Sequence, residues 1–206
     1  INQYKGLPKQ VYIMFFARIV AAMGAFVYPF ITMLLSSRLH FSDQEISVFL
    51  LILAASYIPS ALIGGKLADI FNRKYVYVIV TFLADISFLI AGFYCNSLSV
   101  IYLILIGYFF ANMGNPVTAA MMMDITDPRN RQESLSLCYL GANLGIAVGP
   151  LIAGFLFENY TRWIFWGNAL LSSLAMLIIA IWIKDTRPDE QAVEAILADA
   201  SSQAER

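Results

Sequence analysis

The chain has 206 residues, of which 60% are hydrophobic and 13% are charged, and its formal net charge is -1. This composition, with a mean hydropathy of +0.70, excludes an ordinary soluble domain and predicts a protein that lies in a lipid bilayer. Because the charge is balanced and no basic tract stands out, a nucleic-acid partner is also excluded.

Six apolar runs are long enough to cross a bilayer, which takes about 20 helical residues. They predict an all-α membrane protein with six transmembrane helices, at residues 10–37, 44–71, 75–96, 98–123, 133–157 and 163–183. Most basic residues fall on one side of the alternating connections, namely Lys5, Lys9, Lys66, Arg73, Lys74, Arg129, Arg131, Lys184 and Arg187, and only Arg38 and Arg162 fall on the other. By the positive-inside rule, both termini are then cytoplasmic in a multi-pass protein of the cell membrane.

The connection between the first two runs contains a helix start signal. Ser42 and Glu45 have the S-x-x-E spacing of a capping box, which favours a structural role for this glutamate. His40, the only histidine, is expected to be a solvated loop residue. Cys95 and Cys138 stand alone in apolar runs, so they predict buried thiols and neither a metal site nor a disulfide.

Residues 1–184 are expected to form the helical bundle, and residues 185–206 a cytoplasmic linker. Val193, Ile196, Leu197 and Ala200 follow the i, i+3, i+4, i+7 spacing of an amphipathic helix. This tail and the start at Ile1 lead us to expect a fragment, with a C-terminal six-helix half as the partner outside it. The alternative is a half-length transporter that pairs with itself.

The bundle contains an internal repeat, at residues 10–96 and 98–184. A shift of 89 residues places a glycine, an acidic residue and an arginine at the end of the second run on those at the end of the fifth: Gly65, Asp69 and Arg73 on Gly154, Glu158 and Arg162. Because three helices are an odd number, the two triplets cross the membrane in opposite senses and form an inverted repeat. Chance agreement is the alternative.

The second run ends in a charged corner, with the sequence GGKLADIFNRKY at residues 64–75. Asp69 lies in the last turn of its helix, where the helix dipole disfavours a negative charge, so it needs a partner. Arg73 lies one turn further on, and Asp124, at the end of the fourth run, is a second carboxylate that Arg73 could reach. The alternative is a set of interfacial charges that marks the membrane boundary.

This corner resembles the G-x-L-a-D-r-x-G-r-[rk] signature of the major facilitator superfamily. Gly65, Leu67, Asp69, Arg73 and Lys74 match it, whereas Ile70 and Asn72 stand where the family has Arg and Gly. Asn72 can still adopt the left-handed conformation of a glycine. In the family this corner latches two six-helix halves together on the cytoplasmic side, so the resemblance implies a gate formed by Gly65, Asp69, Arg73 and Asp124.

The fifth run, GANLGIAVGPLIAGF at residues 141–155, resembles the antiporter signature of the same family. It predicts a smooth helix face followed by a bend, from Gly141, Gly145, Gly149, Pro150 and Gly154. A generic packing helix is the alternative. The arginine that the family usually has near the start of its fourth helix is absent here, so the resemblance does not supply a proton site at that place.

Polar side chains at membrane depth are candidates for a substrate site. In the family the first and fourth helices line the central cavity, and the candidates here are Arg18, Tyr28, Asn112, Asn115 and Asn143. The alternative for the amides is an ordinary hydrogen bond between helices.

Asp85 lies about 16 Å along the third run from Lys74, at a rise of about 1.5 Å per residue, and therefore close to mid-membrane. A carboxyl group at that depth takes up a proton more readily than one in water, which makes Asp85 a proton-carrier candidate. The alternative is a fixed, hydrogen-bonded carboxylate.

These features predict a secondary transporter of small molecules that works by alternating access, with proton-coupled efflux or antiport favoured. The sequence has no nucleophile elbow, zinc-ligand cluster or P-loop, so we expect no enzyme, no metal and no cofactor, and a proton or ion gradient as the energy source. Two alternatives stay open: a proton-coupled importer of nutrients or peptides, and a non-transporting membrane sensor or scaffold.

Overall fold

Long apolar helices make up nearly all of the computed structural model, which describes residue 4 and residues 6–184. In chain order the elements are α1 (Lys9–Met23), α2 (Val27–Met33), the π-helical η2 (Leu34–Arg38), α3 (Asp43–Ile70), α4 (Arg73–Phe93), α5 (Ser99–Asp124), α6 (Arg131–Asn159) and α7 (Thr161–Trp182). The described residues contain no strand and six spans that are long and apolar enough to cross a membrane, which confirms the predicted fold class. The linker expected at 185–206 lies outside the described residues.

The start of α3 confirms the predicted capping box. The Ser42 hydroxyl accepts a hydrogen bond from the Glu45 backbone N–H at 3.4 Å, and the Glu45 carboxylate accepts one from the Ser42 backbone N–H at 2.8 Å. These bonds satisfy two N–H groups that a helix start otherwise leaves open. His40, just before the cap, is exposed and has a φ of 56°, as a residue in a tight solvated turn can have.

The first span runs from Lys9 to Arg38, but it is not the continuous helix that was predicted at 10–37, because it is broken between Met23 and Val27. Pro29 gives a physical reason for the break. A proline has no N–H to donate to the carbonyl four residues earlier, and its ring clashes with that carbonyl, which here belongs to Ala25. Pro29 itself is accommodated in the first turn of α2, where no such bond is required.

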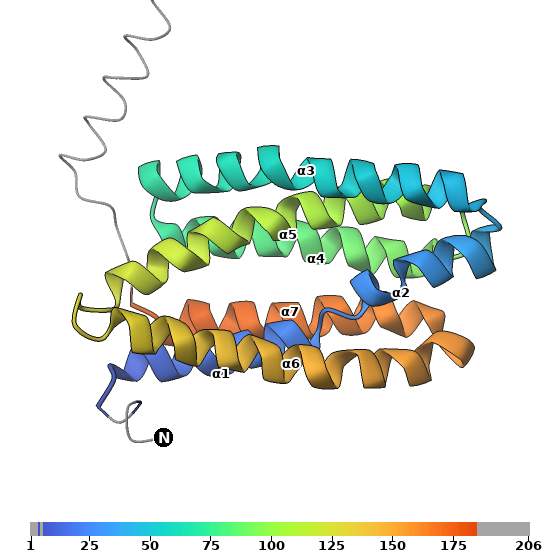
Figure 1. Ribbon diagram of the computed structural model, residues 1–206. Helices are drawn as coiled ribbons and strands as arrows, with labels where there is room; N and C mark the ends of the chain where they lie inside the picture. The colour runs from blue at the N-terminus through green and yellow to red at the C-terminus, as the bar shows by residue number, and fades with distance from the viewer. Residues whose placement is uncertain (1–3, 5, 185–206) are drawn as a thin grey trace, which may run out of the picture.

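The helices lie in two layers, with α3, α4 and α5 in one layer and α1, α6 and α7 in the other (Figure 1). α1 packs on α6 and α7, α5 packs on α3 and α4, and α4 packs on α7 across the layers. Each helix of the first triplet can be exchanged with its counterpart in the second: α1 with α5, α3 with α6, and α4 with α7. This exchange leaves that set of neighbouring helix pairs unchanged. Two repeated three-helix units would give this set of neighbours, and the inverted repeat itself stays a prediction.

The start of the described chain and its end at Lys184 lie at the same end of the bundle. The Lys74 ammonium group, in the first turn of α4, donates a hydrogen bond to the Ile183 carbonyl just after α7, at 3.0 Å. The start of α1 and the connection at 125–130 lie at this end too (Figure 1). We call it the basic end, because most of the described basic residues lie there: Lys9, Lys66, Arg73, Lys74, Arg129, Arg131 and Lys184.

Large apolar side chains cover the outside of the bundle, as a bilayer environment requires. Leu62, Leu151 and Phe155 are 68%, 76% and 77% exposed. Inside, one buried cluster includes Phe88 and Phe165, and a second cluster, toward the basic end, includes Met121. Residues 18–25 of the first span lie between the two clusters, in the middle of the bundle.

Candidate functional site

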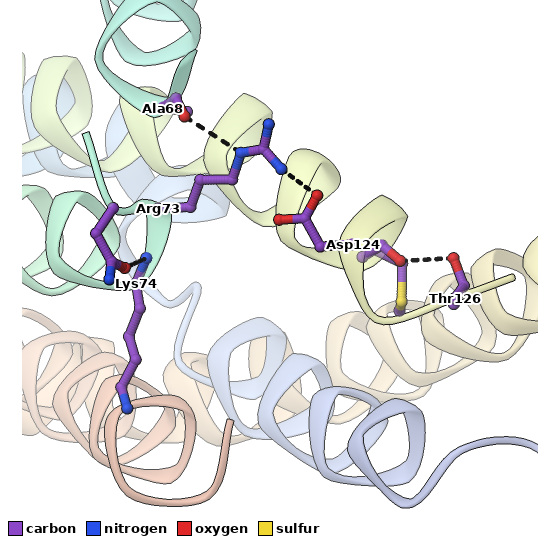
Figure 2. A network of polar contacts seen from close by, with 7 residues as sticks. Ala68, Arg73, Lys74, Asp124 and Thr126 are labelled. Carbon is purple, nitrogen blue, oxygen red and sulfur yellow. Dashed lines mark hydrogen bonds and ion pairs between the residues drawn. The ribbon is translucent and has the colours of Figure 1, made fainter. Parts of the chain in front are cut away.

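The charged corner is organised around Arg73, the first residue of α4. Its Nε donates a hydrogen bond to the Ala68 carbonyl near the end of α3, at 3.2 Å, and its Nη1 forms an ion pair with Asp124, the last residue of α5. Figure 2 shows the guanidinium between these two helix ends. The side chains of Arg73 and Asp124 are 15% and 27% exposed, so water reaches the pair. Arg73 thus joins α3, α4 and α5 at the basic end.

The other two residues of the expected gate lie on an open surface. The Asp69 side chain is exposed, and it forms no hydrogen bond or ion pair with any residue that the structure describes. A Cβ added to Gly65 would meet nothing within 4 Å, whereas one added to Gly64 would collide with the Met113 backbone of α5. Gly64 therefore allows the close packing inside the bundle, and Gly65 and Asp69 face outward. Their role as a gate stays a prediction.

Asn72, which stands where the family signature has glycine, does not use the left-handed conformation, because its φ is -58°. Instead it is the N-cap of α4, and its Oδ1 accepts a hydrogen bond from the Lys74 backbone N–H at 3.1 Å. This departure from the signature has a local reason, since the side chain satisfies an N–H group that a glycine would leave open.

Three glycines of α6 form the contact surface for α1. A Cβ on Gly145 would lie 2.5 Å from the Ile19 carbonyl oxygen and 2.8 Å from the Met23 nitrogen, and a Cβ on Gly149 would lie 2.7 Å from the Met23 carbonyl oxygen. A Cβ on Gly141 would lie 2.8 Å from the nearest α1 side-chain atom. No side chain fits in these places, so the two helix backbones touch along this face, as the sequence predicts.

A cavity of about 460 Å³ opens at the middle of the bundle. Four of the candidate residues line it, Arg18 and Tyr28 from the first span and Asn112 and Asn115 from α5. Most of the remaining lining residues are small or apolar, and Phe88 of α4 is among them. A concave apolar site with a few polar groups is typical of pockets that bind small organic molecules.

The cavity differs from the sequence prediction in α6 and α7. Asn143 shares the i, i+3, i+7 spacing of the lining residues Ile146 and Pro150, but it is exposed and does not line the cavity. Asn168 and Ser172 of α7, which the sequence analysis missed, do line it. These two residues are one helical turn apart in an apolar run, and this polar pair was the signal that could have identified them.

Asp85 lies behind the cavity wall and is not among the residues that line it. Its side chain is buried between α4 and α7, where the Ser173 hydroxyl donates a hydrogen bond to Asp85 Oδ2 at 2.6 Å. The other carboxylate oxygen, Oδ1, is buried and has no hydrogen-bond partner among the described residues. Ser172, next to Ser173, lines the cavity. A single peptide unit thus separates the carboxylate's partner from the cavity wall.

Comparisons with known proteins agree with this arrangement. The family model described as Major Facilitator Superfamily matches residues 14–201. A multidrug transporter of Candida glabrata is 28% identical over 156 residues, which are 74% of this chain and 29% of the relative. Multidrug resistance protein 1 of Bacillus subtilis is 23% identical over 177 residues, or 85% of this chain and 46% of the relative. A Na(+), Li(+), K(+)/H(+) antiporter of Planococcus maritimus is 25% identical over 166 residues, or 78% and 38%.

The chain spans less than half of the length of each of these relatives. The similarity therefore covers one part of each of these longer relatives.

Proposed function

Because the chain belongs to the major facilitator superfamily, we propose that it forms the N-terminal half of a secondary transporter that works by alternating access. The described residues form six spans that are long and apolar enough to cross a membrane. Together with the family membership, these spans show an integral, multi-pass membrane protein. The observation that carries the proposal is the cavity in the middle of the bundle, whose polar groups come from both repeats. A midplane site between repeats is where such transporters bind their substrates.

A second six-helix half of the same polypeptide is the partner that we propose. Three features of the described half support it: Tyr28 is 63% exposed beside the cavity, Gly65 has open space around it, and Asp69 has no described partner. In this proposal the basic end is cytoplasmic. The second half closes the cavity and provides the group that Asp69 binds when the cytoplasmic side is shut.

The direction that we propose is proton-coupled export of small molecules. The glycine face of α6 supports it, since it matches the antiporter signature, and so do the relatives, two of which are named for multidrug transport or resistance and one for cation/proton antiport. Asp85 is the proposed proton carrier, because it is buried and its described hydrogen-bond partners leave Oδ1 without a donor. In this proposal the gradient supplies the energy, and the solute leaves chemically unchanged.

Reconstitution of the complete protein into liposomes tests the proposal. A pH gradient is imposed, and flux is measured for a panel of anionic, neutral and cationic aromatic solutes, with empty liposomes as the control. We expect flux of at least one solute against the direction of proton movement, which stops when nigericin collapses the gradient. Flux in the same direction as protons would identify an importer instead. Absence of protein-dependent flux for the whole panel would favour a sensor or scaffold.

A further inference from the structure

Arg18 is a guanidinium at membrane depth. It lies nine residues after Lys9 in α1, or about 14 Å along the helix at a rise of about 1.5 Å per residue, near the centre of a core about 30 Å thick. Its side chain forms no hydrogen bond or ion pair within the described part of the chain. A charge in the membrane is expensive without a partner, so an unpaired arginine there marks a binding function.

The acidic side chains of the described half do not provide that partner. Asp85 is the one at comparable depth, and its described hydrogen bond comes from Ser173. Asp124 is paired with Arg73, at the basic end. Arg18 is therefore left to bind a group that enters the cavity.

Arg18 lies where three cavities meet. It lines the main cavity of about 460 Å³ and two neighbouring cavities of about 230 and 140 Å³. It is the only charged residue among the described residues that line any of the three. Asn115 lines all three cavities as well, so its amide lies in the same space as the guanidinium. A positive charge with an amide donor beside it is suited to a carboxylate, which guanidinium binds through two parallel hydrogen bonds.

The rest of the main cavity is suited to an aromatic group. The ring of Tyr108 lies edge-on to Tyr28, with centroids 5.9 Å apart, and edge-on to Phe88, with centroids 5.3 Å apart. All three rings line the cavity. A flat apolar solute can join such a cluster through edge-to-face or offset contacts.

We propose that the substrate of this transporter is an organic monoanion, a carboxylate with an aromatic or apolar body, and that Arg18 binds its negative group. The inference rests on the proposed function and narrows it, because a cation would be repelled by Arg18, the one charge that the described residues place in this cavity. In this site the carboxylate lies against Arg18 and Asn115, and the body of the solute lies against the aromatic residues.

Three solutes of nearly equal shape test the charge preference: 2-naphthoate, 2-naphthamide and 2-naphthamidine, which are anionic, neutral and cationic. Binding to the complete purified protein is measured by equilibrium dialysis at pH 7.4. We expect 2-naphthoate to bind best and Arg18→Gln to weaken its binding by about ten- to hundred-fold, the range for loss of charge-assisted hydrogen bonds. Arg18→Lys should keep part of the affinity. Arg162→Gln, which removes an exposed arginine outside the cavity, should have no effect.

Arg18→Glu provides a test that misfolding cannot imitate, because it should reverse the preference and make 2-naphthamidine the best ligand. Equal binding of 2-naphthoate by the wild type and Arg18→Gln, or a wild-type preference for 2-naphthamidine, would overturn the inference. Absence of 2-naphthoate binding would overturn it too. If the anion inference fails in this way, flux of a cationic solute in the liposome assay would still support the transporter proposal. Conversely, Arg18-dependent binding of 2-naphthoate without flux of any solute would refute transport and support the anion site.

Discussion

Arg73 and Asp124 form an ion pair although each lies at the helix end that its charge disfavours. Arg73 is the first residue of α4, near the positive end of that helix dipole, and Asp124 is the last residue of α5, near a negative end. Each charge is therefore stabilised by the other and not by its own helix. A pair of this kind holds the two helix ends together while it is formed, and its loss exposes both charges to unfavourable dipoles.

We expect each single variant, Arg73→Gln and Asp124→Asn, to lower stability by about 1 kcal/mol, the upper range for an ion pair that water reaches. The double variant Arg73→Asp with Asp124→Arg should keep a melting temperature close to that of the wild type, because both charges then suit their helix dipoles. Thermal unfolding of the complete protein in detergent measures this. A double variant that is less stable than both single variants would contradict the dipole argument.

The glycine face of α6 leads to a prediction about packing. Gly145→Ala places a methyl group 2.5 Å from the Ile19 carbonyl oxygen, and a backbone atom cannot move aside as a side chain can. We expect a loss of about 1–3 kcal/mol, as for other overpacked cores. Gly154→Ala is the matched control on the same helix, because its Cβ would first meet an atom at 3.6 Å, which is ordinary contact. Equal melting temperatures for the two variants would show that α1 and α6 do not pack this closely.

Asp85 leads to a prediction about pH dependence. Asp85→Asn keeps the size of the side chain and the bond to Ser173 but cannot exchange a proton. We expect this variant to bind the substrate and to lose most of the dependence of transport on the pH gradient. Asp85→Glu, which still titrates, should keep that dependence. Unaltered pH dependence in Asp85→Asn would remove Asp85 as a carrier and leave it the role of a fixed hydrogen-bond partner to α7.

The orientation in the membrane can be tested with two cysteines at exposed positions. Ser97→Cys lies between α4 and α5, opposite the basic end, and Asp127→Cys lies at the basic end between α5 and α6. In a background where Cys95 and Cys138 are replaced by serine, an impermeant maleimide should label Ser97→Cys in intact cells. It should label Asp127→Cys only after the membrane is permeabilised. The reverse labelling pattern would place the termini outside the cell.

The sequence predicted the spans well because hydrophobic length is a local property. The second run was expected at 44–71 and the helix is Asp43–Ile70, a shift of one residue at each end. Its start could be read from Ser42 and Glu45, whose hydrogen bonds require no distant part of the chain.

The break in the first span could not be decided in the same way. Pro29 and Pro116 lie at nearly equivalent places in the two repeats, yet the chain breaks before Pro29 and runs as one helix through Pro116. A membrane helix tolerates proline when neighbouring groups satisfy the freed carbonyl, so the outcome depends on tertiary packing. Gly24, at the break, packs against α7, where an added Cβ would lie 2.8 Å from the Leu171 Cβ.

The sequence identified polar cavity residues in the first span and α5, which correspond to the first and fourth helices that line the cavity in the family. It did not identify those of α7. Arg18 and Asn112 line the cavity as expected, but Asn168 and Ser172 join it from a helix that lies far away in the sequence. Asn143 was chosen because of its polar side chain, but α6 lines the cavity with Ala142, Ile146 and Pro150, at i, i+4 and i+8, and Asn143 lies off that face.

The break in the first span also affects how the cavity can be studied and how it can evolve. Ala21, Ala22, Gly24 and Ala25 line the cavity beside it, and Pro29 cannot give the Ala25 carbonyl its usual helical N–H. This wall therefore offers a solute methyl groups and main chain in place of functional side chains. A wall of this kind survives sequence drift as long as the residues stay small. An alanine scan would pass over it, since three of the four residues are already alanine.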